Sequence, residues 1–550
     1  MNAPGPAVSG GPDRRSPHLP LFEAAVLALA LFAAWRFASR WAIEGDDLNV
    51  LFGMQHLDVL STASVYRYGW QPLAYDLFFA AMRAGLTAQG ALAFGALLGG
   101  AGFALIVIAA VDLYRRAAPG RPWGRAGQAA LIVAVACQEL WITALYFNTT
   151  ALGLPFFVVA LWAALRSGLA APGSAASAAA RGALVGASLA VASLMRLDYA
   201  TAGALLLLLL GQGPQRGAAI AAFAAMLALA FGGFALLRPE WPQLIFDVVT
   251  RYGGETFPGW TAYKSFLVLV ATAGTGLLAV LLVLPGHGWR RLRALATPRW
   301  LLLWLSMLPM LVPALNLYSG KYLIPVLVSL LLLGFRGWGR QLPGGRAAPS
   351  PGAPSALRLG LGWTLVVLLC VGGLSHPRDV KRTPVAAWFT APFEIDTHDG
   401  IRYVGFFART AREFADSQTA HENMRLMRDL GRAVRERLHA DAANPCPREL
   451  VLAMPPRVWF WAPILVELGQ PGWRLADWRH EHSASFVFGT AGAPRRLTLH
   501  GPQAPVAGAA STLIDLSDIY ARGEESATDY GRRKQAELAR APVCAVVAAQ

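Results

Sequence analysis

The sequence predicts a polytopic α-helical membrane protein of about eleven transmembrane helices, followed by a small C-terminal α/β domain. Three observations predict this class. Of the 550 residues, 55% are hydrophobic and only 15% are charged, whereas about a quarter of the residues of a soluble domain are charged. The apolar residues form runs of about 15 to 22, the length that crosses roughly 30 Å of hydrocarbon as a helix. Arginine-rich and arginine-poor loops alternate between these runs, as in proteins that cross a membrane repeatedly.

Residues 1–18 are rich in Pro, Gly and Ser, and with Arg14 and Arg15 they are predicted to form a disordered basic tail in the cytoplasm. The transmembrane domain is predicted over residues 19–375. Its apolar runs are 20–41, 91–112, 127–146, 150–166, 182–196, 199–211, 217–237, 264–285, 300–316, 321–335 and 357–375. The fifth and sixth runs are short. Segments 168–180 and 341–356, rich in Ala, Gly, Ser or Pro, are predicted to be flexible linkers.

The loop charges predict which side of the bilayer each loop faces. With the N-terminus in the cytoplasm, alternate loops hold groups of arginines such as Arg115–Arg116 and Arg290–Arg291, while the opposite loops carry scattered charge of both signs. Because Lys and Arg concentrate in cytoplasmic loops, the C-terminus is predicted to be extracytoplasmic. The formal net charge of +15 lies largely in these short loops, so the lipid bilayer is the expected partner and nucleic acid is not.

Residues 376–550 have a different pattern and are predicted to form the extracytoplasmic α/β domain. Met424, Met427, Leu430, Val434 and Leu438 recur at spacings of three and four residues, which is typical of an amphipathic helix. Further elements are expected as strands at 449–454, 472–478 and 495–500 and a helix at 459–468. Cys446 and Cys544 flank these strands and are predicted to be able to form a disulfide, since the predicted compartment is oxidising.

A pair of carboxylates, Asp46 and Asp47, directly follows the first apolar run. Charge at the edge of a membrane is costly unless it reaches water or performs a task. One interpretation is that an aspartate caps a helix beginning at Leu48. The other is chemical, because a free carboxylate there can act as a general base. Both interpretations stay open, since one aspartate can cap while the other remains free.

The other loops on the same predicted side add cations and aromatic residues, which suit a phosphate-bearing lipid and a sugar. Arg and Lys bind phosphate oxygens through charge-assisted hydrogen bonds, and aromatic rings offer flat faces to sugars. As an alternative, Arg196, Lys264 and Lys321 could anchor the helices at the lipid headgroups. No His or Cys stands at metal-ligand spacing, so no metal site is predicted from them.

Four stretches resemble the GT-C superfamily of integral-membrane glycosyltransferases. They are Gly45-Asp-Asp47, Arg196-Leu-Asp-Tyr199, Arg251-Tyr-Gly-Gly-Glu-Thr-Phe-Pro-Gly-Trp-Thr-Ala-Tyr-Lys264 and Ser319-Gly-Lys-Tyr-Leu-Ile-Pro325, in that order between residue 20 and about residue 335. The third is similar to a loop of the bacterial arabinofuranosyltransferase-like members. It departs from that subgroup at Gly259, where Asn is usual, and Asp47 is followed by Leu-Asn.

The resemblance implies a bacterial inner-membrane enzyme that moves a sugar from a polyprenyl-phosphate donor to a glycan, glycolipid or protein acceptor of the envelope. The reaction would occur on the extracytoplasmic face with inversion of the anomeric centre. The resemblance makes Asp46 the general base, and leaves Asp47 to cap the following helix or to orient the acceptor. It makes the donor-phosphate ligands Arg196, Arg251, Lys264 and Lys321, and the substrate-binding residues Asp198, Tyr199, Glu255, Trp260 and Tyr322. Arg67 and Tyr68, from the first loop on the same predicted side, are also predicted to bind substrate. A divalent metal beside Asp47 stays open, and no other cofactor is expected.

One carboxylate can suffice for this chemistry, because a phosphate leaving group needs little protonation, whereas glycoside hydrolysis normally needs two. Two other functions stay open. A flippase or transporter for a lipid-linked sugar would favour charges within the spans and inverted repeats, and neither is evident in the sequence. A non-catalytic scaffold of envelope assembly would use the C-terminal domain as a binding module.

Overall fold

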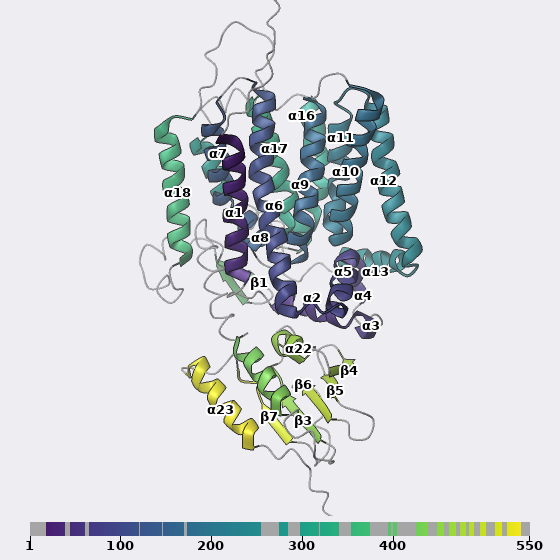
Figure 1. The fold of residues 1–550 in the computed structure, drawn as a ribbon, viewed down its shortest axis with the longest axis vertical. Helices are drawn as coiled ribbons and strands as arrows, with labels where there is room; N and C mark the ends of the chain where they lie inside the picture. The colour runs from purple at the N-terminus through teal and green to yellow at the C-terminus, as the bar shows by residue number, and fades with distance from the viewer. Residues whose placement is uncertain are drawn as a thin grey trace, which may run out of the picture.

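The computed structural model describes residues 18–38, 45–60, 65–119, 122–145, 147–169, 173–254, 274–283, 298–317, 320–339, 354–374, 394–397, 400–403, 425–437, 448–455, 461–468, 473–479, 483–488, 495–501, 512–519 and 525–540. These residues form an apolar helical bundle and a C-terminal α/β unit at one end of it (Figure 1). The chain is thus a mostly helical membrane protein whose C-terminal part contains a sheet.

The bundle is built from α1 (His18–Ala38), α6 (Ala88–Ala117), α7 (Gly124–Ala136), α8 (Gln138–Leu145), α9 (Thr149–Ser167), α10 (Ala175–Met195), η1 (Leu197–Ala202), α11 (Gly203–Leu210), α12 (Arg216–Leu237), a helix at Gly274–Val283, α16 (Pro298–Leu317), η2 (Gly320–Leu323), α17 (Ile324–Gly339) and α18 (Ala356–Leu374). Within the described ranges, α1, α6, α9, α10 and α12 are long and apolar enough to cross a membrane, and six apolar helices are shorter. Each predicted span overlaps one of these helices. The count of eleven crossings therefore depends on the shorter helices.

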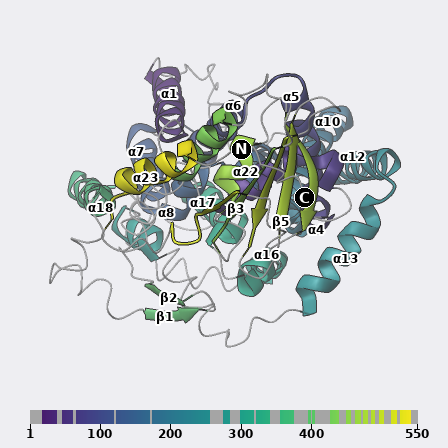
Figure 2. The same ribbon diagram turned by 90° about the horizontal axis from the view of Figure 1, so that it is seen from below.

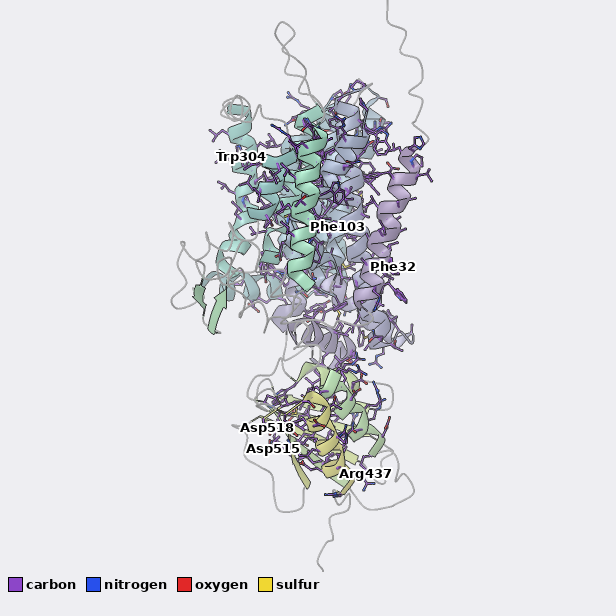
Figure 3. All side chains as sticks on the ribbon, turned by 90° about the vertical axis from the view of Figure 1, so that its left-hand side faces the viewer. Phe32, Phe103, Trp304, Arg437, Asp515 and Asp518 are labelled. Carbon is purple, nitrogen blue, oxygen red and sulfur yellow. The ribbon has the colours of Figure 1, made fainter. Side chains whose placement is uncertain are left out.

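Large apolar side chains face outward from this bundle. Phe32 on α1 is 60% exposed and Trp304 on α16 is 43% exposed, and they lie on opposite sides of the bundle (Figure 3). Leu236 and Leu237 at the end of α12 are still more exposed. Large apolar side chains exposed on several sides of a bundle indicate contact with lipid or with another apolar partner.

Three sequence predictions about the bundle are wrong. Residues 175–180, predicted to belong to a flexible linker, are the first turns of α10, because Ser174 caps them by accepting a hydrogen bond from the amide of Ser177 at 3.2 Å. The fifth span is consequently not short, since α10 has 21 residues. The third predicted span, 127–146, is interrupted at Cys137, which separates α7 from α8.

The central helix is α6, which packs against α1, α8, α9 and α17. Glycines let its neighbours approach closely: a Cβ at Gly95 would lie 2.4 Å from the ring of Phe147, and one at Gly99 would lie 2.1 Å from the carbonyl oxygen of Ala144. Small residues at such contacts let helix backbones meet within a bilayer, where lipid removes the hydrophobic drive for association. The same device joins α10 to α12, through Gly182 and Gly186.

Replacing Gly182 by Leu should separate α12 from α10. A Cβ at Gly182 would lie 2.0 Å from the carbonyl oxygen of Ala219, and backbone cannot move aside as a side chain can. We expect the free energy of unfolding to fall by about 3 kcal/mol, the upper end of ordinary overpacking, seen as a lower melting temperature in detergent. Gly232→Leu on α12 is the matched control, because nothing lies within 4 Å of a Cβ there. Equal melting temperatures for the two variants would contradict this packing.

A layer of short helices closes the end of the bundle nearest the C-terminal unit (Figure 1). It consists of α2 (Gly45–Gln55), α3 (Leu57–Leu60), α4 (Val65–Trp70), α5 (Pro72–Arg83) and α13 (Trp241–Gly254); we call it the junction layer. Here α2 packs on α5, and α4 packs on α13 where the indole nitrogen of Trp241 donates to the carbonyl of Gly69 at 3.2 Å. Because α2 begins at Gly45, Asp46 and Asp47 lie within its first turn, and the predicted helix start at Leu48 is wrong.

The C-terminal unit contains a five-stranded sheet of order β4-β5-β6-β3-β7. The strands are β3 (Arg448–Ala453), β4 (Trp473–Arg479), β5 (Ser483–Phe488), β6 (Arg495–His500) and β7 (Thr512–Asp515). The central strand β3 runs parallel to β6 and β7, whereas β4, β5 and β6 pair antiparallel. Three helices pack with it: residues 425–437, α22 (Ala462–Leu468) and α23 (Ala527–Arg540). A separate hairpin joins β1 (Glu394–Thr397) to β2 (Gly400–Tyr403).

The predicted helix in this unit is confirmed at 425–437, where Met427, Leu430 and Val434 are buried. The predicted strands at 449–454, 472–478 and 495–500 correspond to β3, β4 and β6, and α22 covers the second part of the predicted helix. The sequence reasoning missed β5, β7 and α23, and also the hairpin of β1 and β2. The predicted disulfide between Cys446 and Cys544 lies outside the described residues.

Candidate functional site

Most of the predicted site residues have their backbones at the end of the bundle that meets the C-terminal unit. Asp46 and Asp47 are on α2, Arg67 and Tyr68 on α4, Arg251 on the last turn of α13, Arg196 to Tyr199 at the joint of α10 and η1, and Lys321 and Tyr322 on η2. The end of α10 adjoins the junction layer, because Met195 shares one apolar core with Leu51 and Phe52 of α2. Five separate parts of the chain therefore lie at this end of the bundle.

Several of these residues are described only by their backbone. The side chains of Asp46, Asp47, Arg67, Arg251 and Lys321 lie outside the described part of the structure, as do Glu255, Trp260 and Lys264 altogether. The roles predicted for these residues remain predictions. The geometry can be examined at Arg196, Asp198, Tyr199, Tyr322 and Tyr68.

Arg196 is the centre of a buried polar cluster. Its Nε donates to Oδ2 of Asp198 at 2.6 Å, its Nη1 donates to Oγ1 of Thr149 at 3.2 Å, and its guanidinium lies 4.6 Å from the ring centroid of Tyr322. Both charged side chains are only 4% exposed. A charge-assisted pair and a cation–π contact together fix an arginine strongly. Arg196 thus joins the start of α9 to η1 and η2.

This pairing changes what Arg196 can do. Asp198 neutralises its charge, so the cluster has no surplus positive charge with which to hold a phosphate. Its visible effect is to fix η2, because the guanidinium contacts Tyr322. Lys321 directly precedes Tyr322 in the same element. The second carboxylate oxygen of Asp198, Oδ1, is buried and receives no hydrogen bond from the residues that the structure describes. A buried acceptor of this kind carries a free-energy cost of about 1–3 kcal/mol.

Tyr199 is a packing residue in this structure. It is fully buried, and its hydroxyl donates to the carbonyl oxygen of Thr150 at 2.7 Å. Its ring lies 5.0 Å from that of Phe157, and Gly153 leaves room for it, because a Cβ there would lie 2.6 Å from the Tyr199 ring. The predicted substrate-binding role of Tyr199 therefore has no accessible polar atom to support it.

A second polar cluster joins the junction layer to the end of α12. The hydroxyl of Tyr68 donates to Oδ2 of Asp76 at 3.1 Å, and Nη2 of Arg238 donates to Oδ1 of the same carboxylate at 2.8 Å. Burial, and then the Asp76 carboxylate, raise the pKa of Tyr68 above its usual range, so the phenol stays protonated and acts as a donor. The side chain of Arg238 is 44% exposed, so this neutral ion pair reaches the surface beside the predicted site.

Sequence reasoning missed the ion pair of Arg238 with Asp76. The one signal from Arg238 was its place directly after the seventh apolar run, where it resembles an ordinary headgroup anchor. Its partner Asp76 is 162 residues away in the sequence. No local pattern joins the two.

Within the described residues, no group of three or more His, Cys, Asp or Glu side chains could hold a metal ion. The carboxylates of Asp46 and Asp47 are outside those residues, so they do not enter that statement. No step proposed below is routed through a metal.

No protein-family model matches the chain, and no curated protein sequence matches it. The solved structures that match include two crystal structures of ArnT from Cupriavidus metallidurans. The structure bound to undecaprenyl phosphate is 13% identical, with 82% of this chain and 85% of that chain covered and a TM-score of 0.47. The apo structure is 15% identical, with coverages of 81% and 84% and a TM-score of 0.46. With both TM-scores below 0.5, the function is argued from the residues of this chain.

Proposed function

We propose that this protein is an integral-membrane glycosyltransferase that moves a sugar from a polyprenyl-phosphate donor to a hydroxyl of an envelope glycan, glycolipid or protein. The observation that carries the proposal is that the acidic start of α2 and the segments that bear Arg251 and Lys321 lie at one end of an apolar bundle. A lipid-linked phosphate needs an apolar environment and a charged one. Its tail requires apolar helices, and its headgroup requires cations at their ends.

The proposed reaction is a single displacement. Asp46 accepts the proton of the acceptor hydroxyl while the acceptor oxygen bonds to the anomeric carbon from the face opposite the phosphate. The bond between that carbon and the phosphate oxygen breaks, polyprenyl phosphate leaves, and the anomeric centre is inverted. Lys321, Arg251 and Lys264 stabilise the charge that develops on the departing phosphate. Arg196 supports this arrangement by holding η2 in place.

The reaction is proposed for the extracytoplasmic face of the bacterial inner membrane. The alternation of arginine-rich loops supports this orientation. Single cysteines placed at Gly288 and at Ala420 should then react with an impermeant thiol reagent from opposite sides of the membrane. A common side for both positions would contradict the orientation, and with it the assignment of the junction layer to the extracytoplasmic face.

The proposed function is tested with the purified full chain in lipid nanodiscs, using synthetic polyprenyl phosphates that carry pentoses or hexoses and a mixture of envelope glycolipids as acceptors. We expect release of polyprenyl phosphate that depends on the acceptor, together with a glycosylated product of inverted configuration. A transporter would instead move intact donor across proteoliposomes without releasing phosphate. Absence of transfer from every donor, with donor movement or simple binding in its place, would overturn the enzyme assignment.

A further inference from the structure

We infer that the C-terminal α/β unit holds α2 in position, and that Phe486 on β5 is a positioning residue for the predicted base Asp46. The inference rests on the proposed function for its effect on catalysis. The physical contact on which it stands is independent of that function. It assigns a role to a unit for which the sequence suggested none beyond a binding module.

The helix α2 is held from two sides. On the bundle side it packs on α5, where a Cβ at Gly53 would lie 3.0 Å from the ring of Tyr75. On the other side it packs against α22 of the C-terminal unit. Seen from below, α22 lies beneath the middle of the bundle, while α13 lies at its edge (Figure 2). A helix of 11 residues is too short to be stable alone in water, so these two contacts determine where α2 lies.

The contact with the C-terminal unit is mainly apolar. Leu51 and Met54 are fully buried in one core with Trp461 and Ile464. The ring centroid of Phe486 lies 6.3 Å from that of Phe52, with the rings edge to face. A polar contact is added where Nε2 of Gln55 donates to the carbonyl oxygen of Val466 at 3.5 Å. The face of α2 one to two turns after Asp46 is thus covered by residues of the tail.

His56, just beyond α2, completes the apolar contact. Its ring centroid lies 4.8 Å from that of Phe52 and 6.3 Å from that of Phe486. Burial lowers the pKa of His56 to about 4, against a smaller opposing effect of Asp58 and a lowering by Arg83. The imidazole is therefore uncharged at neutral pH and packs as an aromatic ring.

A second link fixes the unit to the bundle. Arg428, on the helix 425–437, donates through Nε to Oε1 of Glu467 at 2.8 Å and through Nη1 to Oε1 of Gln89 at 3.3 Å. Glu467 lies on α22, and Gln89 lies in the first turn of α6. The unit therefore contacts the central helix of the bundle as well as α2. A shift of α22 would have to break both links.

Position matters here because Asp46 lies six residues before Phe52, or about 9 Å along the helix axis. A misplacement of about 1 Å at a reacting group costs roughly 100-fold in rate. Phe486→Ala removes the ring against which Phe52 packs, and we expect turnover to fall about 10- to 100-fold with the KM for the donor nearly unchanged. Val487→Ala is the matched control, because adjacent residues of a strand point to opposite faces. Phe486→Leu retains apolar volume and should restore most of the turnover.

Hydrogen exchange provides a readout that does not depend on activity. In the full-length protein in nanodiscs, the amides of α2 should exchange about tenfold or more faster in Phe486→Ala than in Val487→Ala or the wild type. Phe52→Ala removes the same contact from α2 itself and should speed the exchange to the same extent. It replaces Phe486→Ala as the test if that variant does not fold. Unchanged exchange of α2 in the folded variants would overturn the inference. If the wild type has no transferase activity while Phe486→Ala still speeds the exchange of α2, the proposed function is overturned and the positioning role stands.

Discussion

Asp46→Asn should lower the turnover of sugar transfer about 100- to 10,000-fold, the range typical for loss of a general base. Asparagine keeps the shape of the side chain and can still form hydrogen bonds, but it cannot accept the proton of the acceptor hydroxyl. Asp46 lies in the first turn of α2, where a carboxylate stabilises a helix by only about 0.3–1 kcal/mol. The protein should therefore remain folded and bind the donor, so kcat measured in nanodiscs reports the chemical role.

Asp47→Asn is the control for this variant, since it changes the neighbouring carboxylate of the same turn. We expect a milder effect, because Asp47 is predicted to orient the acceptor or to stabilise the start of the helix. Near wild-type transfer by Asp46→Asn would refute its role as the base. An inactive Asp47→Asn beside an active Asp46→Asn would transfer the role to Asp47 and leave the site in place.

Arg196→Ala should lower the free energy of unfolding by about 3–5 kcal/mol, the cost of removing one partner of a buried ion pair. The carboxylate of Asp198 would then stay in a site where its side chain is only 4% exposed, without the charge that compensates it. The contact with Tyr322 would be lost as well. Melting of the purified variant in detergent measures the loss of stability.

A double variant distinguishes loss of the ion pair from loss of packing. Arg196→Ala/Asp198→Ala leaves no buried charge, so it should recover a large part of the stability that Arg196→Ala loses. Arg83→Ala provides a comparison at an exposed pair, since the side chains of Arg83 and Asp58 are 63% and 46% exposed and such pairs contribute less than about 1 kcal/mol. A double variant no more stable than Arg196→Ala alone would show that buried charge is not the main cost.

Much of the fold follows from local pattern. Runs of apolar residues predict the bundle because a membrane-crossing helix must be apolar along its length, and each predicted span overlaps an apolar helix. In the tail, β3 and β6 are clear because their buried residues alternate or run together. By contrast, β5 begins with Ser483-Ala484-Ser485, which has little strand preference by itself. It is a strand because β4 and β6 pair with its two edges.

The candidate site was predictable in its position and not in its pairings. Loop order and charge predict which segments share an end of the bundle. They do not predict that Arg238 pairs with Asp76, 162 residues away. Nor do they separate Tyr199, whose hydroxyl bonds to the backbone of α9, from a tyrosine that faces a substrate. Such distinctions depend on tertiary contacts, which no short segment contains.

The contact between α2 and the tail also sets the order in which the protein can mature. Gln55 and the Val466 carbonyl that it contacts are 411 residues apart in the sequence. A ribosome adds roughly 5–20 residues per second, so about 20–80 seconds separate the synthesis of the two residues. Throughout that interval the acidic helix lacks one of its two supports while the membrane helices are already being inserted. If the tail positions α2 for catalysis, a chain that still lacks residues 461–488 has little activity, and sugar transfer begins only after these residues have been made.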